Sequence, residues 1–443
     1  MKIQLSDHFT YGKLFRFVIP SIVMMVFTSI YGVVDGFFVS NYVGKTAFSA
    51  LNLVVPFIMI LGGMGFMVGA GGSALIAKEF GAGKREKANR YFTILIIFTV
   101  IMALVLTVVG IVFIRPAAYL LGATEDMIDY CVLYGRIVIA FTVFFMLQNV
   151  FQSFLIVAEK PKLGLAVTVA AGVTNMILDA VFVAGFKWGL AGAALATGIG
   201  QCVGGVLPMV YFFRSKESPL CFTKTKLQLS PILKACTNGS SELMSNISTS
   251  LVSMVYNFQL MRFIGEDGVS AYGVLMYVQF IFIAISIGYS IGSASIVSYN
   301  FGAENHMELK NMFKKGVIIM SLSGVILTAI ALLLASPLAR IFVGYDEGLF
   351  ELTKHAFYLF AFSFLLAGFN IFASGFFTAL NNGIVSAAIS FLRTLLFQTA
   401  AVIVMPIFFD VDGIWLAITV SEVFAFAVSL IFLISLRKKY HYA

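Results

Sequence analysis

Long runs of apolar residues alternate with short polar loops along the whole chain. About twenty apolar residues are enough for a helix to cross the hydrocarbon core of a bilayer, and longer runs indicate tilted or extended helices. The pattern therefore predicts an all-α polytopic membrane protein with twelve transmembrane helices. The expected spans are residues 14–40, 47–77, 91–114, 127–156, 162–186, 189–213, 231–263, 269–299, 312–335, 348–378, 384–409 and 413–436.

The chain contains an internal repeat. Residues 71–82 (GGSALIAKEFGA) match residues 292–303 (GSASIVSYNFGA) at an offset of 221 residues, and both segments close an even-numbered span. Chance similarity between helices rich in small residues is the alternative, but the matching positions favour a repeat. Six spans per repeat predict two pseudo-symmetric six-helix bundles, related by an axis along the membrane normal, with substrate held between them.

This repeat divides the chain into three expected parts. They are an N-terminal six-helix lobe (residues 1–213), a cytoplasmic linker (residues 214–230) and a C-terminal six-helix lobe (residues 231–443).

Composition agrees with this interpretation, because 60% of the residues are hydrophobic and only 11% are charged. Soluble proteins carry about a quarter charged residues. Of the 29 lysines and arginines, 21 lie at the termini or in the loops that follow even-numbered spans. Basic loops are typical of the cytoplasmic side, so we expect a cytoplasmic (inner or plasma) membrane protein with both termini in the cytoplasm. The net charge of +8 reflects these loops and does not indicate a nucleic-acid partner.

We single out five ionisable residues that fall within the predicted spans rather than near their ends. An ionised side chain at the bilayer centre costs about 2.5–3.5 kcal/mol on insertion scales, so each one needs a partner, a proton or water. They are Asp35, Asp179, Glu242, Arg393 and Glu422.

Two of these residues are expected to meet in the first lobe. Asp35 and Asp179 lie about five and about seven residues from the outer ends of their spans, hence at similar depth. Asn175 precedes Asp179 by four residues on the same helix face, and Thr197 lies in the outer half of span 6. Two neighbouring carboxylates cannot both stay charged cheaply at low dielectric. The four residues are therefore predicted to take up a proton, or to share a sodium ion. Alternatively, Asp179 only hydrogen-bonds the backbone.

The second lobe differs, since its three ionisable residues fall near mid-depth. We expect Arg393 and Glu422 to form a buried structural ion pair. Glu242 is expected to face the cavity, as a substrate contact or a second cation site. Gln279 is a further candidate for the cavity, although amides within bundles more often form interhelical hydrogen bonds. Pro20 removes a backbone hydrogen bond within span 1 and allows a bend that would move Asp35.

Several segments together resemble the multidrug and toxic compound extrusion (MATE) family over essentially the whole chain. They are residues 30–40 (IYGVVDGFFVS), the Phe80-Gly-Ala-Gly-Lys loop with its Phe301-Gly-Ala counterpart, Asn175-Met-Ile-Leu-Asp179, and Thr197 at the family's span-6 threonine position. The resemblance implies cation-driven export of amphipathic or cationic compounds by alternating access. It also implies that the carboxylates of the first lobe are the coupling site.

Residues 355–379, which make up most of span 10, include no acidic residue, so Glu242 lacks the partner that forms a second cation site in some members. The pattern resembles the DinF-like branch, which implies proton coupling.

We therefore expect a monomeric antiporter surrounded by membrane lipid, with no enzymatic activity and no cofactor beyond a coupling proton or, alternatively, sodium. A lipid or lipid-linked oligosaccharide flippase of the same superfamily is the main alternative, but it would need cationic residues in its cavity, and only Arg393 qualifies. A major-facilitator transporter would not show the Phe-Gly-Ala repeat. A membrane enzyme would need motifs that the chain lacks, and a passive channel gains little from paired buried carboxylates.

Overall fold

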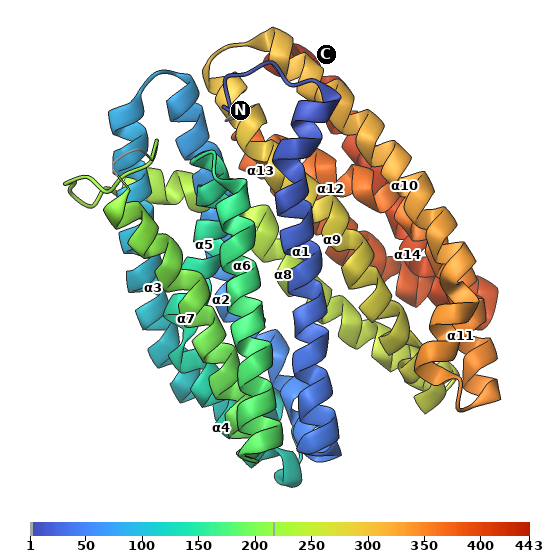
Figure 1. Ribbon diagram of the computed structural model, residues 1–443. Helices are drawn as coiled ribbons and strands as arrows, with labels where there is room; N and C mark the ends of the chain where they lie inside the picture. Colours follow the sequence, from blue (N-terminus) through green and yellow to red (C-terminus); the bar gives the residue numbers. More distant parts are fainter. Residues whose placement is uncertain (1–2, 216–217) are drawn as a thin grey trace.

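The computed structural model describes residues 3–215 and 218–443, which fold into helices joined by short loops (Figure 1). Met1, Lys2, Lys216 and Glu217 lie outside the described residues; the last two belong to the predicted linker. The first half contains α1 (Tyr11–Tyr42), α2 (Lys45–Gly81), α3 (Arg85–Leu120), α4 (Glu125–Ala140), α5 (Thr142–Val157), α6 (Pro161–Asp179), the π-helix η1 (Ala180–Gly185) and α7 (Gly189–Arg214). The second half contains α8 (Leu229–Phe263), α9 (Glu266–Gly302), α10 (His306–Val343), α11 (Glu347–Phe360), η2 (Ala361–Ser363), α12 (Phe364–Ala379), α13 (Gly383–Ser390), the π-helix η3 (Phe391–Phe397) and α14 (Gln398–Tyr440).

These helices confirm the predicted all-α membrane fold. Among the described residues, nine helices are long and apolar enough to cross a membrane, or ten if the α4–α5 pair, bent by 55°, is one span. Two further spans come from α8, which is more polar than the other long helices, and from α14, which contains a turn. Some predicted spans are bent or consist of consecutive shorter helices, so the number of helices in the structure differs from the number of predicted spans.

Helix α14 reverses direction at Asp410, whose backbone is non-helical (φ 48°, ψ −131°). Arg393 of η3 contacts Glu422, 29 residues later in the chain. A straight helix would separate these residues by about 43 Å, at 1.5 Å per residue. Spans 11 and 12 are therefore two antiparallel helices, as the sequence predicts.

Below, α1–α7 are called the first lobe and α8–α14 the second lobe. The lobes meet through α1 with α9 and α2 with α8, near the end of the molecule that carries both termini, here called the terminus end (Figure 1). Toward the opposite end, the far end, the two bundles splay apart in the view of Figure 1.

The repeated Phe-Gly-Ala motif lies at this contact between lobes. A Cβ atom added to Gly81 would lie 1.9 Å from the carbonyl oxygen of Tyr299, and one added to Gly302 would lie 2.0 Å from that of Lys78. Any side chain at either position would push the two backbones apart. Each repeat therefore supplies the glycine that lets the other repeat approach, which explains why the motif occurs twice.

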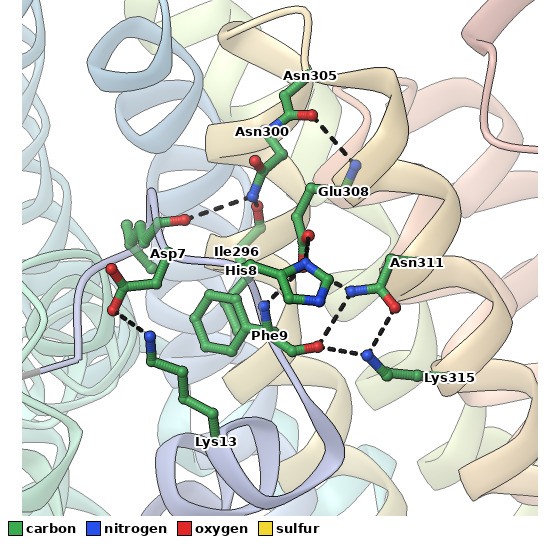
Figure 2. A network of polar contacts seen from close by, with 11 residues as sticks. Asp7, His8, Phe9, Lys13, Ile296, Asn300, Asn305, Glu308, Asn311 and Lys315 are labelled. Carbon is green, nitrogen blue, oxygen red and sulfur yellow. Dashed lines mark hydrogen bonds and ion pairs between the residues drawn. The ribbon is translucent and has the colours of Figure 1, made fainter.

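Residues 3–10, here called the N-terminal strap, connect the two lobes at the terminus end, and Figure 2 shows their contacts with the second lobe. The backbone N–H of Leu5 donates to Glu159 of the first lobe (2.9 Å), whereas that of Phe9 donates to Glu308 of α10 (3.0 Å). Glu308 also lies 2.6 Å from Nδ1 of His8. Leu5 and Phe9 are buried, so the strap is packed as well as hydrogen-bonded.

A second segment, residues 218–228, here called the linker strap, also connects the two lobes. It precedes α8 of the second lobe but binds α3 of the first lobe. The N–H of Cys221 donates to Asn89 (3.1 Å), and that of Thr223 donates to Thr93 (3.0 Å). The segment leading into each lobe thus contacts the other lobe, and both straps lie at the terminus end.

Candidate cation-coupling site

The structure brings together the four residues that the sequence predicts as a cation site in the first lobe. Thr197 of α7 donates from Oγ1 to Oδ1 of Asp35 on α1, at 3.5 Å. The side chains of Asp179 and Asn175, both on α6, also lie beside the Asp35 carboxyl. Asp179 is fully buried and Asn175 is 3% exposed. Three helices therefore converge on one polar cluster.

Local structure explains how α6 presents its two polar residues. Asp179 is the last residue of α6, immediately before the π-helix η1. A π-turn interrupts the regular α-helical hydrogen bonding and frequently occurs at functional sites. Asn175 lies one turn earlier on the same face. Gly200 of α7 allows close packing here, since a Cβ atom there would lie 3.1 Å from Cβ of Asn175.

The buried polar atoms of this cluster are not satisfied by the protein. Within the described residues, neither carboxylate oxygen of Asp179 and neither amide atom of Asn175 has a hydrogen-bond partner. An unsatisfied buried polar group costs about 1–3 kcal/mol, and more when it is charged. A proton on one carboxyl would turn the repulsion between Asp35 and Asp179 into a hydrogen bond, and a monovalent cation would satisfy their oxygens directly. The arrangement therefore suits uptake and release of a small cation.

Two tyrosines that sequence reasoning missed border the cluster. Tyr134 of α4 is 3% exposed, and its hydroxyl lies beside Thr197, near both carboxyls. Tyr31 lies one turn before Asp35 on α1. The four-residue spacing from Asp35 could have revealed Tyr31, but no sequence pattern connects Tyr134 to the other helices.

Arg393 and Glu422 form the predicted contact in the second lobe. Nε of Arg393 lies 2.9 and 3.0 Å from the two carboxylate oxygens, and Nη2 lies 2.7 Å from Oε1. The two side chains are 14% and 5% exposed. Asn370 adds a hydrogen bond of 2.7 Å to Oε2 of Glu422. The structural role of this pair stays a prediction.

The remaining candidates lie outside the cluster, near the boundary between lobes. Glu242 and Gln279 are half-buried, and neither forms a side-chain hydrogen bond in the part of the chain that the structure describes. Leu243, next to Glu242, packs at the position of Gly63 on α2. Phe280, next to Gln279, accepts a hydrogen bond from Ser29 of α1 (3.5 Å). Their predicted roles as substrate contacts or a second cation site remain open to test.

Pro20 is buried within α1, which continues as one helix from Tyr11 to Tyr42. The next residues, Ser21 and Ile22, form a close approach to the second lobe. A Cβ atom on Gly288 of α9 would lie 2.5 Å from Cα of Ile22. A bend at Pro20 would therefore change the contact between lobes, but the predicted role of Pro20 as a hinge stays a prediction.

The described residues contain no group of three or more histidine, cysteine, aspartate or glutamate side chains arranged to hold a metal ion. The cluster around Asp35 instead combines two carboxyls with an amide and a hydroxyl. Carboxyl, amide and hydroxyl oxygens are hard ligands, and hard cations such as sodium bind to ligands of this kind.

Comparison with known families decides the class of the protein. The MatE family model matches residues 20–181 and 243–403, one segment in each predicted lobe. The chain belongs to the MatE family. Members of this family are transporters and not enzymes, as the sequence predicts.

Relatives and solved structures agree with this assignment. The multidrug export protein MepA of Staphylococcus saprophyticus is 23% identical over 94% of this chain and 91% of its own length. A crystal structure of MATE in complex with MaL6 has a TM-score of 0.90 at 20% identity, covering 96% of this chain and 95% of that one. The outward-facing structure of a multidrug resistance MATE family transporter of the MOP superfamily has a TM-score of 0.89 at 21% identity, covering 96% of each chain. At this identity the structural likeness establishes the MATE fold, whereas the DinF-like branch stays a prediction.

Proposed function

We propose that this MATE protein is a cation-coupled antiporter that exports amphipathic or cationic drugs by alternating access. The observation that carries the proposal is the partly buried cluster of Asp35, Asp179, Asn175 and Thr197, whose carboxylate oxygens are only partly satisfied by the protein. The MepA relatives, which are multidrug export proteins, support small drugs as the substrate class.

We propose a proton as the coupling ion, with sodium as the alternative. When one carboxyl holds a proton, Asp35 and Asp179 can share a hydrogen bond and the helices that carry them stay together. When the proton leaves, the two like charges repel each other at low dielectric. This change is localised between α1 and α6, and α1 also packs against α9 of the second lobe. Loss of the cation thus acts on a helix that contacts both lobes.

The distribution of contacts between lobes supports an outward-open state. The glycine contacts of the Phe-Gly-Ala motifs and both straps lie at the terminus end, which we propose to be cytoplasmic. Alternating access requires these contacts to break so that the terminus end can open. In this proposal the protein acts as a monomer in the cytoplasmic membrane, with both termini in the cytoplasm.

Transport in proteoliposomes tests the proposal. The wild type should accumulate ethidium in vesicles with an acidic lumen, because protons leave in exchange for the dye. Asp35→Asn and Asp179→Asn should each abolish gradient-driven accumulation. Asp126→Asn is the matched control, because Asp126 is an exposed acidic residue of the same lobe.

Unchanged transport in both site variants would contradict the proposal. Accumulation driven only by a sodium gradient would indicate that the same site couples transport to sodium and not to protons. If neither gradient drives transport of ethidium, labelled lipid is the next substrate to test, because a flippase is the alternative function.

A further inference from the structure

A hollow of about 470 Å³ lies between α3 and α4, toward the far end of the first lobe. Arg115 of α3 lines one side. The residues on α4 recur at three- and four-residue spacing, so they share one helix face. They are Asp129, Val132, Leu133, Arg136 and Ile137.

The side chains that line the hollow carry a net positive charge. Nη2 of Arg115 pairs with Oδ1 of Asp129 at 2.9 Å, and both side chains are largely exposed. Arg136 is also exposed, and it forms no ion pair or hydrogen bond with any residue that the structure describes. Two arginines and one aspartate leave one positive charge in excess.

The position of Arg136 indicates that this charge faces lipid. Arg136 lies seven residues beyond Asp129 along α4, or about 10 Å further from the far end. Helix α4 packs against α2, α3 and α7, which leaves its remaining side open. The neighbouring apolar side chains are exposed, with Val108 at 65%, Val112 at 64% and Leu133 at 45%. Such a surface is typical of contact with acyl chains.

A membrane-facing arginine needs an anion that can reach it. A soluble anion would have to leave water and enter the apolar surface around the hollow, at a high desolvation cost. A lipid phosphate is held at the headgroup level beside this surface, and arginine binds phosphate through charge-assisted and often bidentate hydrogen bonds. The length of the arginine side chain also lets Arg136 extend toward the headgroup level.

We propose that this hollow binds the phosphate of an anionic phospholipid in the far-end leaflet. Arg136 is the principal contact, Arg115 is the second, and the acyl chains lie along the exposed apolar face of α3. The site lies on the outer surface of the first lobe, so it is distinct from the coupling cluster and from the contact between lobes. It does not depend on the proposed transport function.

Native mass spectrometry of the full-length protein tests this proposal with two lipids of matched acyl chains, phosphatidylglycerol and phosphatidylcholine. The wild type should retain a first phosphatidylglycerol in clear preference to phosphatidylcholine. Arg136→Gln should weaken that binding about tenfold, the usual effect of losing a hydrogen bond to a charged group. Asp129→Asn should strengthen it, because it removes the competing carboxylate.

Arg262→Gln is the control, because Arg262 is an exposed arginine at the far end of α8 that does not line the hollow. This variant should bind phosphatidylglycerol as the wild type does. Arg136→Lys, which keeps the charge, should restore part of the binding if Arg136→Gln weakens it through loss of charge and not through misfolding.

Equal retention of the two lipids by the wild type would overturn the proposal, as would wild-type retention of phosphatidylglycerol by Arg136→Gln. Displacement of the bound lipid by glycerol phosphate at equal concentration would also overturn it, because the site would then prefer a soluble anion.

Discussion

The ion pair between Arg393 and Glu422 gives a prediction for stability that depends on whether one partner or both partners are removed. Replacing either residue alone by methionine leaves the other buried without its counter-charge. Replacing both, in Arg393→Met/Glu422→Met, removes both charges and keeps similar side-chain volume. The double variant is therefore expected to be more stable than either single variant, although it removes more polar contacts.

The structure sets the magnitude. The pair has three contacts of 2.7–3.0 Å between nitrogen and oxygen, and both side chains are largely buried. Removing one partner of such a pair costs about 3–5 kcal/mol of unfolding free energy, whereas replacing both by apolar residues is often neutral or stabilising. Asn370 keeps its hydrogen bond of 3.0 Å to the backbone oxygen of residue 422 in all variants. We therefore expect the double variant to lie within about 1 kcal/mol of the wild type.

The assay is a dodecyl sulfate titration of the detergent-solubilised protein, followed by tryptophan fluorescence. Trp415 is fully buried on the same helix as Glu422 and therefore reports on unfolding at this site. The reasoning would be refuted if the single variants were as stable as the wild type, or if the double variant lost the sum of their two effects. Loss of ethidium transport in a stable double variant would contradict a purely structural role for the pair.

Three further predictions concern the contact between lobes, the N-terminal strap and the coupling site. Gly71→Leu should hold the terminus end open, because a Cβ atom at this position would lie 1.9 Å from the Ala235 carbonyl oxygen. Spin labels at positions 84 and 310 should therefore move apart in this variant. Gly63→Ala is the control and should leave that distance unchanged, because its Cβ atom would meet only the tip of a leucine side chain and another Cβ atom. Glu308→Gln should speed amide hydrogen exchange at Phe9, whose N–H donates to Glu308, whereas Glu304→Gln at an exposed position should not. Tyr134→Phe removes the hydroxyl beside Thr197 and should shift the midpoint of the pH dependence of transport; an unchanged midpoint would exclude Tyr134 from the site.

Much of the architecture could be predicted from the sequence because membrane spans obey strong physical limits. The length of each apolar run fixes where a helix can cross the bilayer. The expected spans 384–409 and 413–436 place a turn between them, and the structure has this turn at Asp410. The constant offset between Phe80-Gly-Ala and Phe301-Gly-Ala also revealed the repeat, but the reason for the glycine became clear only from the contacts of Gly81 and Gly302.

The site could be predicted in part for a similar reason. Charged residues inside a membrane are rare, so Asp35 and Asp179 stand out, and depth along their helices places them together. Tyr134 could not be found, because a tyrosine in a span is common and its contact with Thr197 depends on how α4 packs against α7. The straps were also missed, since hydrogen bonds from the backbone of Phe9 and Cys221 carry no sequence signature.

Cation release on drug binding is the most direct test of the central claim, that the cluster around Asp35 couples cation binding to drug export. The purified protein would be mixed with ethidium in weakly buffered detergent solution while the pH is recorded, and a sodium electrode would follow the alternative ion. We predict that the wild type releases a proton when ethidium binds, and that Asp35→Asn and Asp179→Asn bind ethidium without this release. Proton or sodium release by both variants at the wild-type level would contradict the account.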